Sequence, residues 1–261
     1  MTHGLIYALS GLVVGFVIGL TGVGGGSLMT PLLLWVGFHP TTAVGTDLIY
    51  AALTKAVGTV AQHAGGTIDW RIVRHLAYGS VPATALTLFV LSHISPASPA
   101  LAQTIKLVLG VALVLTAFSL LLRTYLVDLM ARRFGVPSDH RADILTIVAG
   151  AVVGVLVSLS SVGAGAIGVT ALLLLYPKLP LARIVGTDIA HGVPLTLVAG
   201  AGYWARGDVD WELLGFLLTG SIPGILAGST MAPRLPEKGL RPVMAAILLF
   251  VGVSTVMHAY R

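Results

Sequence analysis

Three charged residues interrupt apolar segments at positions where a membrane protein would need a reason to carry them. Asp47 and Asp188 each follow a Gly-Thr pair, and Lys55 comes two turns after Asp47. An ionisable residue inside a membrane segment is a functional residue by default. Each aspartate could bind and release a proton, or it could accept structural hydrogen bonds from the opposing glycine loop or from Thr46 and Thr187. Direct contact with an anion is less favourable, because a carboxylate repels it.

Lys55 and His191 are the other two polar candidates within apolar helices. A buried ammonium at Lys55 could hold an anionic substrate. It could instead form a salt bridge with Asp47 or Asp188, or extend to the membrane surface. His191 lies one turn after Asp188 and could relay protons, although a lone helix histidine is more often a packed polar residue. Thr46 and Thr187 are further candidates for substrate binding.

Two glycine-rich stretches, 22–27 and 161–165, flank short apolar runs. A helix needs roughly 20 apolar residues to cross the bilayer, and the run after 22–27 has about half of that. Each stretch is therefore a loop at the membrane surface or a helix break at membrane depth. At such a break, the unpaired N–H groups at the start of the next helix can bind an anion. The alternative is close helix packing through small residues. The candidate substrate-binding positions are Gly24, Gly25, Gly26, Ser27, Gly163 and Gly165.

The composition excludes several other classes of protein. The chain of 261 residues is 56% hydrophobic and only 10% charged, whereas soluble domains carry about 25% charged residues. It therefore predicts an integral membrane protein with helical segments. The absence of cysteine, of a His/Glu metal spacing and of a Gly-Lys-Ser/Thr sequence after the glycines predicts no metal, cofactor or nucleotide site. The net charge of +5 reports membrane orientation, and nucleic acid is not an expected partner.

The apolar segments predict an all-α membrane protein. The first segment is expected to stay in the membrane, because the four residues before it lack the positive charge of a signal peptide. One long polar connection, 123–143, separates the fifth segment from the sixth. The predicted segments are about 5–21, 27–38, 41–62, 75–92, 101–122, 144–160, 165–176, 183–204, 212–230 and 240–258.

Four motifs recur in the same order on both sides of this connection, at offsets of 139 or 141 residues. This regularity indicates a duplication, in which Thr196 corresponds to Lys55. The pairs are Gly22-Val23-Gly24-Gly25-Gly26 with Ser161-Val162-Gly163-Ala164-Gly165, Gly45-Thr46-Asp47 with Gly186-Thr187-Asp188, Asp69-Trp70 with Asp210-Trp211, and Gly79-Ser80-Val81-Pro82 with Gly220-Ser221-Ile222-Pro223.

The distribution of Lys and Arg predicts that the two repeats have inverted topology. If each glycine segment enters the membrane and returns, eleven Lys and Arg residues share one side and two lie on the other. The side rich in Lys and Arg is cytoplasmic. The predicted division is a first repeat at 1–122, a cytoplasmic linker at 123–143 and a second repeat at 144–261. Each repeat has a broken glycine-rich segment and three membrane helices. The count leaves open whether the glycine segments are re-entrant hairpins or pairs of short crossings.

These glycine, Gly-Thr-Asp and Gly-Ser-x-Pro motifs resemble those of the sulfite exporter TauE/SafE family of membrane permeases, over essentially the whole chain. The resemblance implies about eight membrane helices in two related halves. It also implies transport of organosulfur compounds or sulfur oxyanions across the bacterial inner membrane. Ala164 stands where the first copy has Gly25, and Ser161 where it has Gly22, so the second loop is expected to be less open.

The function predicted from these observations is secondary transport of a small anion, a sulfur oxyanion or organosulfonate by resemblance. Alternating access would occur around the two glycine loops near the midplane, with Asp47 or Asp188 coupling transport to protons. The alternatives are an anion channel and a membrane-embedded enzyme or accessory subunit. An enzyme is not expected, because no nucleophile–base cluster stands out. The expected partners are the anion and the lipid bilayer, and a homodimer is compatible with the sequence.

Overall fold

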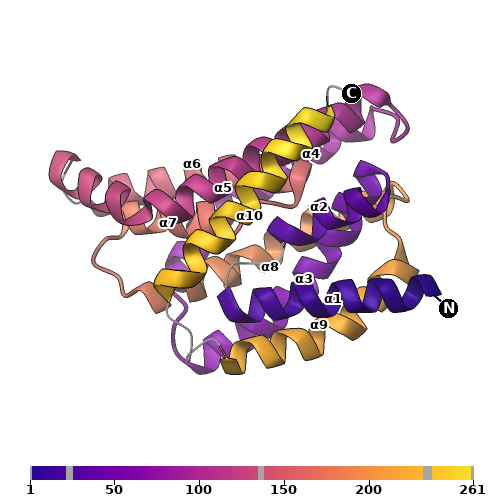
Figure 1. Cartoon of the computed structure of the whole chain (residues 1–261). Coiled ribbons are helices and arrows are strands. Elements are labelled where there is room, and N and C mark those ends of the chain that lie inside the picture. Colours follow the sequence, from indigo (N-terminus) through magenta and orange to yellow (C-terminus); the bar gives the residue numbers. More distant parts are fainter. Residues whose placement is uncertain (1, 22–25, 135–137, 232–236, 260–261) are drawn as a thin grey trace.

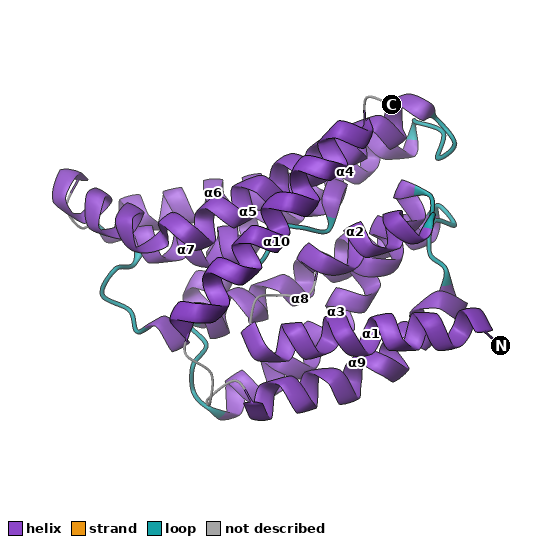
Figure 2. Ribbon diagram, viewed as in Figure 1, coloured by secondary structure: helices purple, strands orange, loops and turns teal. Residues whose placement is uncertain are grey.

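The computed structural model describes residues 2–21, 26–134, 138–231 and 237–259, and these residues form α-helices joined by short loops, with no strand among them (Figures 1 and 2). The fold is therefore all-α, as predicted. The helices are α1 (Thr2–Thr21), α2 (Gly26–Val36), α3 (Pro40–Ala64), α4 (Trp70–Ser92), α5 (Pro99–Phe134), α6 (Asp139–Ser160), α7 (Ala166–Leu175), α8 (Leu181–Ala205), α9 (Trp211–Met231) and α10 (Glu237–Ala259).

Six of the described helices are long and apolar enough to cross a membrane, which confirms a multi-pass membrane protein. They are α4, α5, α6, α8, α9 and α10. Two shorter apolar helices fall at Gly4–Ile18 and Ala166–Leu175. Helix α3 is absent from both groups, although its 25 residues are enough to span the bilayer. Its low hydropathy follows from polar residues that include Asp47 and Lys55, so the least apolar long helix carries the candidate site.

The polar connection predicted at 123–143 is largely helical. Helix α5 continues to Phe134, and α6 begins at Asp139. Leu and Arg are good helix formers, so the helix persists after the apolar run ends. The division of the chain into two repeats and a linker stays a prediction.

Each long helix that begins before residue 123 packs against a helix that begins after residue 138. Helix α1 packs on α9, α3 on α8, α4 on α6 and α5 on α10. Figure 1 shows α1 and α9 side by side along one edge of the molecule, with α5 and α10 on the opposite side. Helices α3 and α8 contact each other between these layers, so the centre is built from both halves of the sequence.

The repeated Gly-Ser-x-Pro motif lies where these helices approach most closely. A Cβ atom on Gly79 of α4 would overlap the carbonyl oxygen of Ile147 on α6. In the corresponding place, a Cβ atom on Gly220 of α9 would overlap the carbonyl oxygen of Ala8 on α1. Small residues let membrane helices pack backbone to backbone. The glycines of this motif are thus packing residues, and the same contact occurs twice.

The repeated Asp-Trp motif begins a helix in both places, α4 at Trp70 and α9 at Trp211. Asp69 caps α4, because its carboxylate accepts a hydrogen bond from the Arg71 N–H at 3.1 Å. Asp210 accepts a bond from the Leu213 N–H at 2.9 Å at the start of α9. A side-chain oxygen at this position satisfies an N–H group that has no partner within the helix.

Candidate functional site

The centres of α3 and α8 carry four ionisable side chains that are almost completely buried. The exposed fraction is 0% for Asp47, 7% for Lys55, 2% for Asp188 and 1% for His191. Burying charged groups is costly unless they are paired or hydrogen-bonded. The structure therefore brings all four of these predicted residues into the interior, close to the break between α6 and α7.

Asp47 is held by one hydrogen bond and has one oxygen atom left over. The Thr30 hydroxyl of α2 donates a hydrogen bond to Asp47 Oδ2. Asp47 Oδ1 has no hydrogen-bond partner among the described residues. The Ser161 hydroxyl, at the end of α6, lies close to the same carboxylate but has no aligned hydrogen bond. Asp47 thus links α3 to the short helix α2. It also faces the break between α6 and α7.

Asp188 has no comparable support, although it occupies the corresponding position in the duplication. Its Oδ1 atom is buried without a hydrogen-bond partner among the described residues. The carboxylate lies directly against α7, where a Cβ atom on Gly168 would overlap Oδ1. Buried polar atoms are normally hydrogen-bonded, so an unsatisfied carboxylate oxygen needs an explanation such as a proton, an ion or a ligand. The two aspartates therefore differ in chemistry despite their equivalent places.

Lys55 reaches from α3 across to the second half. Its Nζ atom donates a hydrogen bond to the Ala164 carbonyl oxygen at 3.1 Å, within the break between α6 and α7. Its side chain passes over Gly192 of α8, where a Cβ atom would lie 2.6 Å from Nζ. Asp188 and Asp47 are the two carboxylates whose negative charge acts on the ammonium. Neither carboxylate is in a salt bridge with it, since the ion pairs between described residues involve other groups.

His191 and its counterpart Tyr50 occupy equivalent places and both face a serine of the Gly-Ser-x-Pro motif. His191 Nε2 shares a hydrogen bond with the Ser80 hydroxyl at 2.8 Å. The Tyr50 and Ser221 hydroxyls lie close to each other, but neither has an aligned hydrogen-bond partner among the described residues. The polar interior thus has satisfied atoms near His191 and unsatisfied atoms near Tyr50.

The break between α6 and α7 is a buried, glycine-dependent turn. Helix α6 ends before Ser161, which has left-handed backbone geometry with φ of 58°. Gly163 and Gly165 have φ of 122° and 153°, values that residues other than glycine rarely adopt. Residues 161–166 are all buried, so the break is enclosed in protein, the condition under which a bilayer tolerates it. The first N–H groups of α7 have no partner within the helix.

The corresponding stretch of the first half is described only at its borders. Helix α1 ends at Thr21 and α2 begins at Gly26. The predicted residues Gly24 and Gly25 lie outside the described residues. Gly26 and Ser27 are the first residues of α2, and the Ser27 side chain is not among the described ones.

Thr46 and Thr187 each contact a residue from the other half of the sequence. The Thr46 hydroxyl accepts a hydrogen bond from the Asp210 N–H at 3.0 Å, and the Thr187 hydroxyl accepts one from the Asp69 N–H at 2.9 Å. The repeated Gly-Thr-Asp and Asp-Trp motifs therefore bind each other reciprocally. The substrate-binding role of the two threonines stays a prediction.

Three participants were not predicted from the sequence. The Thr30 hydroxyl, the Ser80 hydroxyl and the Ala164 carbonyl oxygen each bind one of the buried ionisable groups. Ser80 belongs to a repeated motif, which was a usable signal. Thr30 is a single threonine in an apolar run, and a carbonyl oxygen is not visible in a sequence, so neither gave a signal.

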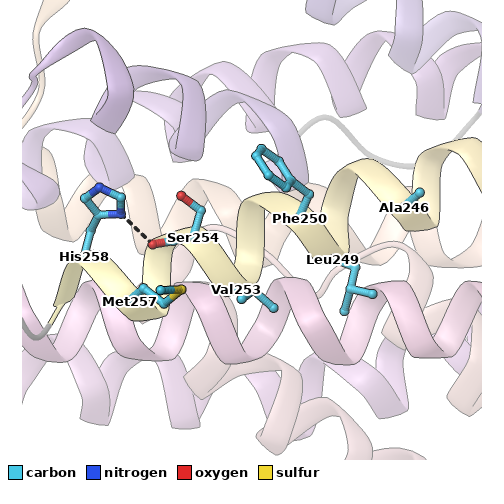
Figure 3. A pocket seen from close by; sticks show the side chains of 7 residues that line it. All are labelled: Ala246, Leu249, Phe250, Val253, Ser254, Met257 and His258. Atoms are coloured by element: carbon cyan, nitrogen blue, oxygen red, sulfur yellow. Dashed lines mark hydrogen bonds between the residues drawn. The ribbon is translucent and has the colours of Figure 1, made fainter.

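A groove of about 500 Å³ lies away from this cluster, along α10 (Figure 3). Its lining is apolar apart from Ser254 and His258, and the histidine ring is held by a 2.8 Å contact between Nδ1 and the Ser254 carbonyl oxygen. An apolar face on a spanning helix is what contact with lipid requires. The groove therefore offers no polar site comparable to the cluster between α3 and α8.

Comparison with known proteins places the whole chain in one family. The model of the family described as sulfite exporter TauE/SafE matches residues 7–255. The probable membrane transporter protein YjnA of Bacillus subtilis (strain 168) is 40% identical over 250 residues, covering 95% of this chain and 98% of the relative. YdhB of the same organism, also a probable membrane transporter protein, is 28% identical over 257 residues, with coverage of 94% and 98%.

A more distant relative is a probable membrane transporter protein of Xylella fastidiosa (strain Temecula1). It is 24% identical over 261 residues, which cover 96% of this chain and 94% of the relative. No solved structure matches the chain. The family match spans nearly all of the helices described above and agrees with the resemblance seen in the glycine and Gly-Thr-Asp motifs. The chain therefore belongs to the sulfite exporter TauE/SafE family of membrane transporters.

Proposed function

We propose that this protein is a secondary transporter for a small anion, a sulfur oxyanion or organosulfonate, in the bacterial inner membrane. The observation that carries the proposal is the buried cluster of Asp47, Lys55, Asp188 and His191 beside a helix break. Ionisable groups at this depth mark substrate and proton pathways in membrane proteins. Paired broken helices with their ends at the membrane midplane are a recurring transporter architecture.

The substrate anion binds where the second half of each broken helix begins. The start of α7 at Ala166 and the start of α2 at Gly26 present N–H groups and the positive end of a helix dipole. Glycines here let an oxyanion reach the backbone without a side chain in the way. Lys55 adds a positive charge next to the α6–α7 break, because its ammonium already contacts the Ala164 carbonyl oxygen.

Protons couple to transport through Asp188 in this proposal, while Asp47 has a structural role. Both aspartates have a buried Oδ1 atom without a partner among the described residues, but only Asp47 also has its Oδ2 atom bound by the Thr30 hydroxyl. Lys55 is the charged group that acts on Asp188, and the same ammonium also acts on Asp47 and His191. When Lys55 turns toward an arriving anion, the Asp188 carboxylate loses its positive neighbour and gains a proton. That proton would then cross the membrane together with the anion.

Inverted topology of the two repeats would allow alternating access around this centre. The eleven-to-two distribution of Lys and Arg supports inversion. The reciprocal contacts between the repeated motifs support a two-fold relation between the repeats. Rocking of one repeat against the other would then expose the same anion site to each side in turn.

The test uses purified protein in proteoliposomes, with labelled sulfite as the probe and an inward proton gradient. We expect Asp188→Asn to lose gradient-driven accumulation while it retains exchange of labelled for unlabelled anion. The Asp47→Asn variant, as a matched control, should keep the pH dependence of uptake and lose stability. Accumulation with an unchanged pH dependence in Asp188→Asn would contradict the proton-carrier role.

The identity of the anion needs a separate measurement. A thermal-shift screen of sulfur-containing and carboxylate anions on the purified protein should show stabilisation by sulfur oxyanions or organosulfonates. Stabilisation by carboxylates alone would overturn the proposed substrate class and leave the transport mechanism to be tested with those anions.

A further inference from the structure

We propose that the Lys55 ammonium occupies a monovalent-cation site built by both halves of the protein, and so replaces a bound Na⁺ or K⁺ ion. Transporters with broken helices commonly bind an alkali cation through backbone carbonyl oxygens of the unwound segment and nearby polar groups. Here the position is filled by a cation that is covalently part of the chain. This inference goes beyond the proposed transport of an anion, because it states which cation the folded protein needs at this position.

The first support is the carbonyl oxygen that the ammonium contacts. Lys55 Nζ donates to the Ala164 carbonyl oxygen at 3.1 Å, and this carbonyl belongs to the unwound segment between α6 and α7. The carboxylates of Asp188 and Asp47 add negative charge near the ammonium without forming a salt bridge with it. A carbonyl oxygen of an unwound helix segment is the type of ligand that binds Na⁺ in such transporters.

The second support is the space made for the ammonium on α8. A Cβ atom on Gly192 would lie 2.6 Å from Lys55 Nζ and 2.7 Å from its Cδ atom. Such distances are too short for van der Waals contact, so a residue other than glycine would displace the lysine. The side chain therefore lies in a slot that fixes the ammonium beside the break, and does not extend to the membrane surface.

The third support is the asymmetry of the duplication. Thr196 occupies the place that corresponds to Lys55, and its hydroxyl donates to the Gly192 carbonyl oxygen at 2.7 Å within its own helix. One ammonium thus serves both Asp47 and Asp188. Two carboxylates and one ammonium leave one negative charge without a counter-charge. If the transport function proposed above holds, a proton neutralises that carboxylate, in agreement with a single proton carrier.

The direct test is chemical rescue of Lys55→Ala, read as thermal stability of the purified protein. n-Propylammonium reproduces the lysine side chain beyond Cβ, so it should enter the vacated slot. At concentrations well above its Kd we expect it to raise the Tm of Lys55→Ala by about 2–4 °C. Tetramethylammonium is too wide and should have no effect, and the wild type, whose slot is filled, should not respond. This readout does not depend on transport, so its failure is distinct from failure of the proposed function.

Two further variants locate the site and guard against a loss of folding. Thr196→Ala, the matched control in the other half, should not respond to propylammonium. The double variant Lys55→Ala/Asp188→Asn should bind propylammonium at least tenfold more weakly than Lys55→Ala, because the negative charge of Asp188 is gone. If Lys55→Ala does not fold, Lys55→Gln and Lys55→Arg are compared, because both can donate a hydrogen bond and only Arg is charged.

Equal responses of wild type and Lys55→Ala to propylammonium would overturn the proposal. So would a Lys55→Gln variant with the stability of the wild type, because a neutral hydrogen-bond donor to Ala164 would then be sufficient. Retention of stability by Lys55→Arg together with its loss in Lys55→Gln supports a requirement for the positive charge.

Discussion

Gly192→Ala is expected to destabilise the protein by displacing the Lys55 ammonium. The added Cβ atom would lie 2.6 Å from Nζ, whereas ordinary contact begins at 3.4 Å, so Nζ must move by about 0.8 Å. The hydrogen bond to the Ala164 carbonyl oxygen is already 3.1 Å long, close to the upper limit of about 3.2 Å. The displacement therefore breaks this bond.

The size of the effect follows from two opposing terms. A hydrogen bond from a charged donor contributes about 1.5–3 kcal/mol. Replacing glycine by alanine inside a helix raises the free energy of unfolding by about 0.5–1 kcal/mol. We therefore expect Gly192→Ala to lower the free energy of unfolding by about 1–2 kcal/mol. The assay is equilibrium unfolding in mixed micelles, followed by helical circular dichroism.

A double-mutant cycle with Lys55 tests the cause of this loss. In the Lys55→Ala background the new Cβ atom has no ammonium to displace, so Gly192→Ala should become neutral or stabilising. Gly215→Ala on α9 is the matched control, because nothing lies within 4 Å of its added Cβ atom. A Gly192→Ala loss that persists in the Lys55→Ala background, or an equal loss in Gly215→Ala, would refute the reasoning.

Two further predictions test the arrangement of the two repeats, and a third tests the first glycine loop. Thr46→Val and Thr187→Val each remove a hydrogen bond between repeats, so each should lower the free energy of unfolding by about 0.6–1.7 kcal/mol; a stability equal to wild type in both would contradict the reciprocal contacts. A cysteine at Ser138 should react with an impermeant reagent only after permeabilisation, and one at Ser95 in intact cells; the opposite pattern would exclude the cytoplasmic linker. Gly25→Val should abolish uptake while the protein stays folded in the membrane, because a side chain blocks the backbone from the anion; normal uptake would leave this loop a packing element.

The sequence was sufficient for the helices, because hydrophobic length is a strong signal in a membrane protein. Each of the ten predicted apolar segments coincides with a helix in the described residues. The burial of Asp47, Lys55 and Asp188 also followed from their positions within apolar runs. Helix ends were less predictable, and α5 passes well beyond its apolar part because good helix formers continue past residue 122.

The partners of the buried groups could not be predicted, because they come from contacts across the duplication. Repetition of Gly-Thr-Asp and Asp-Trp was visible in the sequence, but their reciprocal binding through Thr46 and Thr187 required the structure. The chemical difference between the two aspartates was also hidden. It arises from Thr30 on α2, whose hydroxyl serves Asp47, while Gly168 of α7 offers Asp188 no donor side chain.

Counter-flow in proteoliposomes tests the central claim, that the chain carries an anion by alternating access, most directly. Vesicles with the wild-type protein are preloaded with unlabelled sulfite and diluted into trace labelled sulfite, without a proton gradient. A carrier exchanges one anion for another, so we predict a transient accumulation of label above its external concentration, absent from protein-free vesicles. Label that rises only to equilibrium would indicate a channel, and no entry of label would contradict transport of this anion; either result would refute the account.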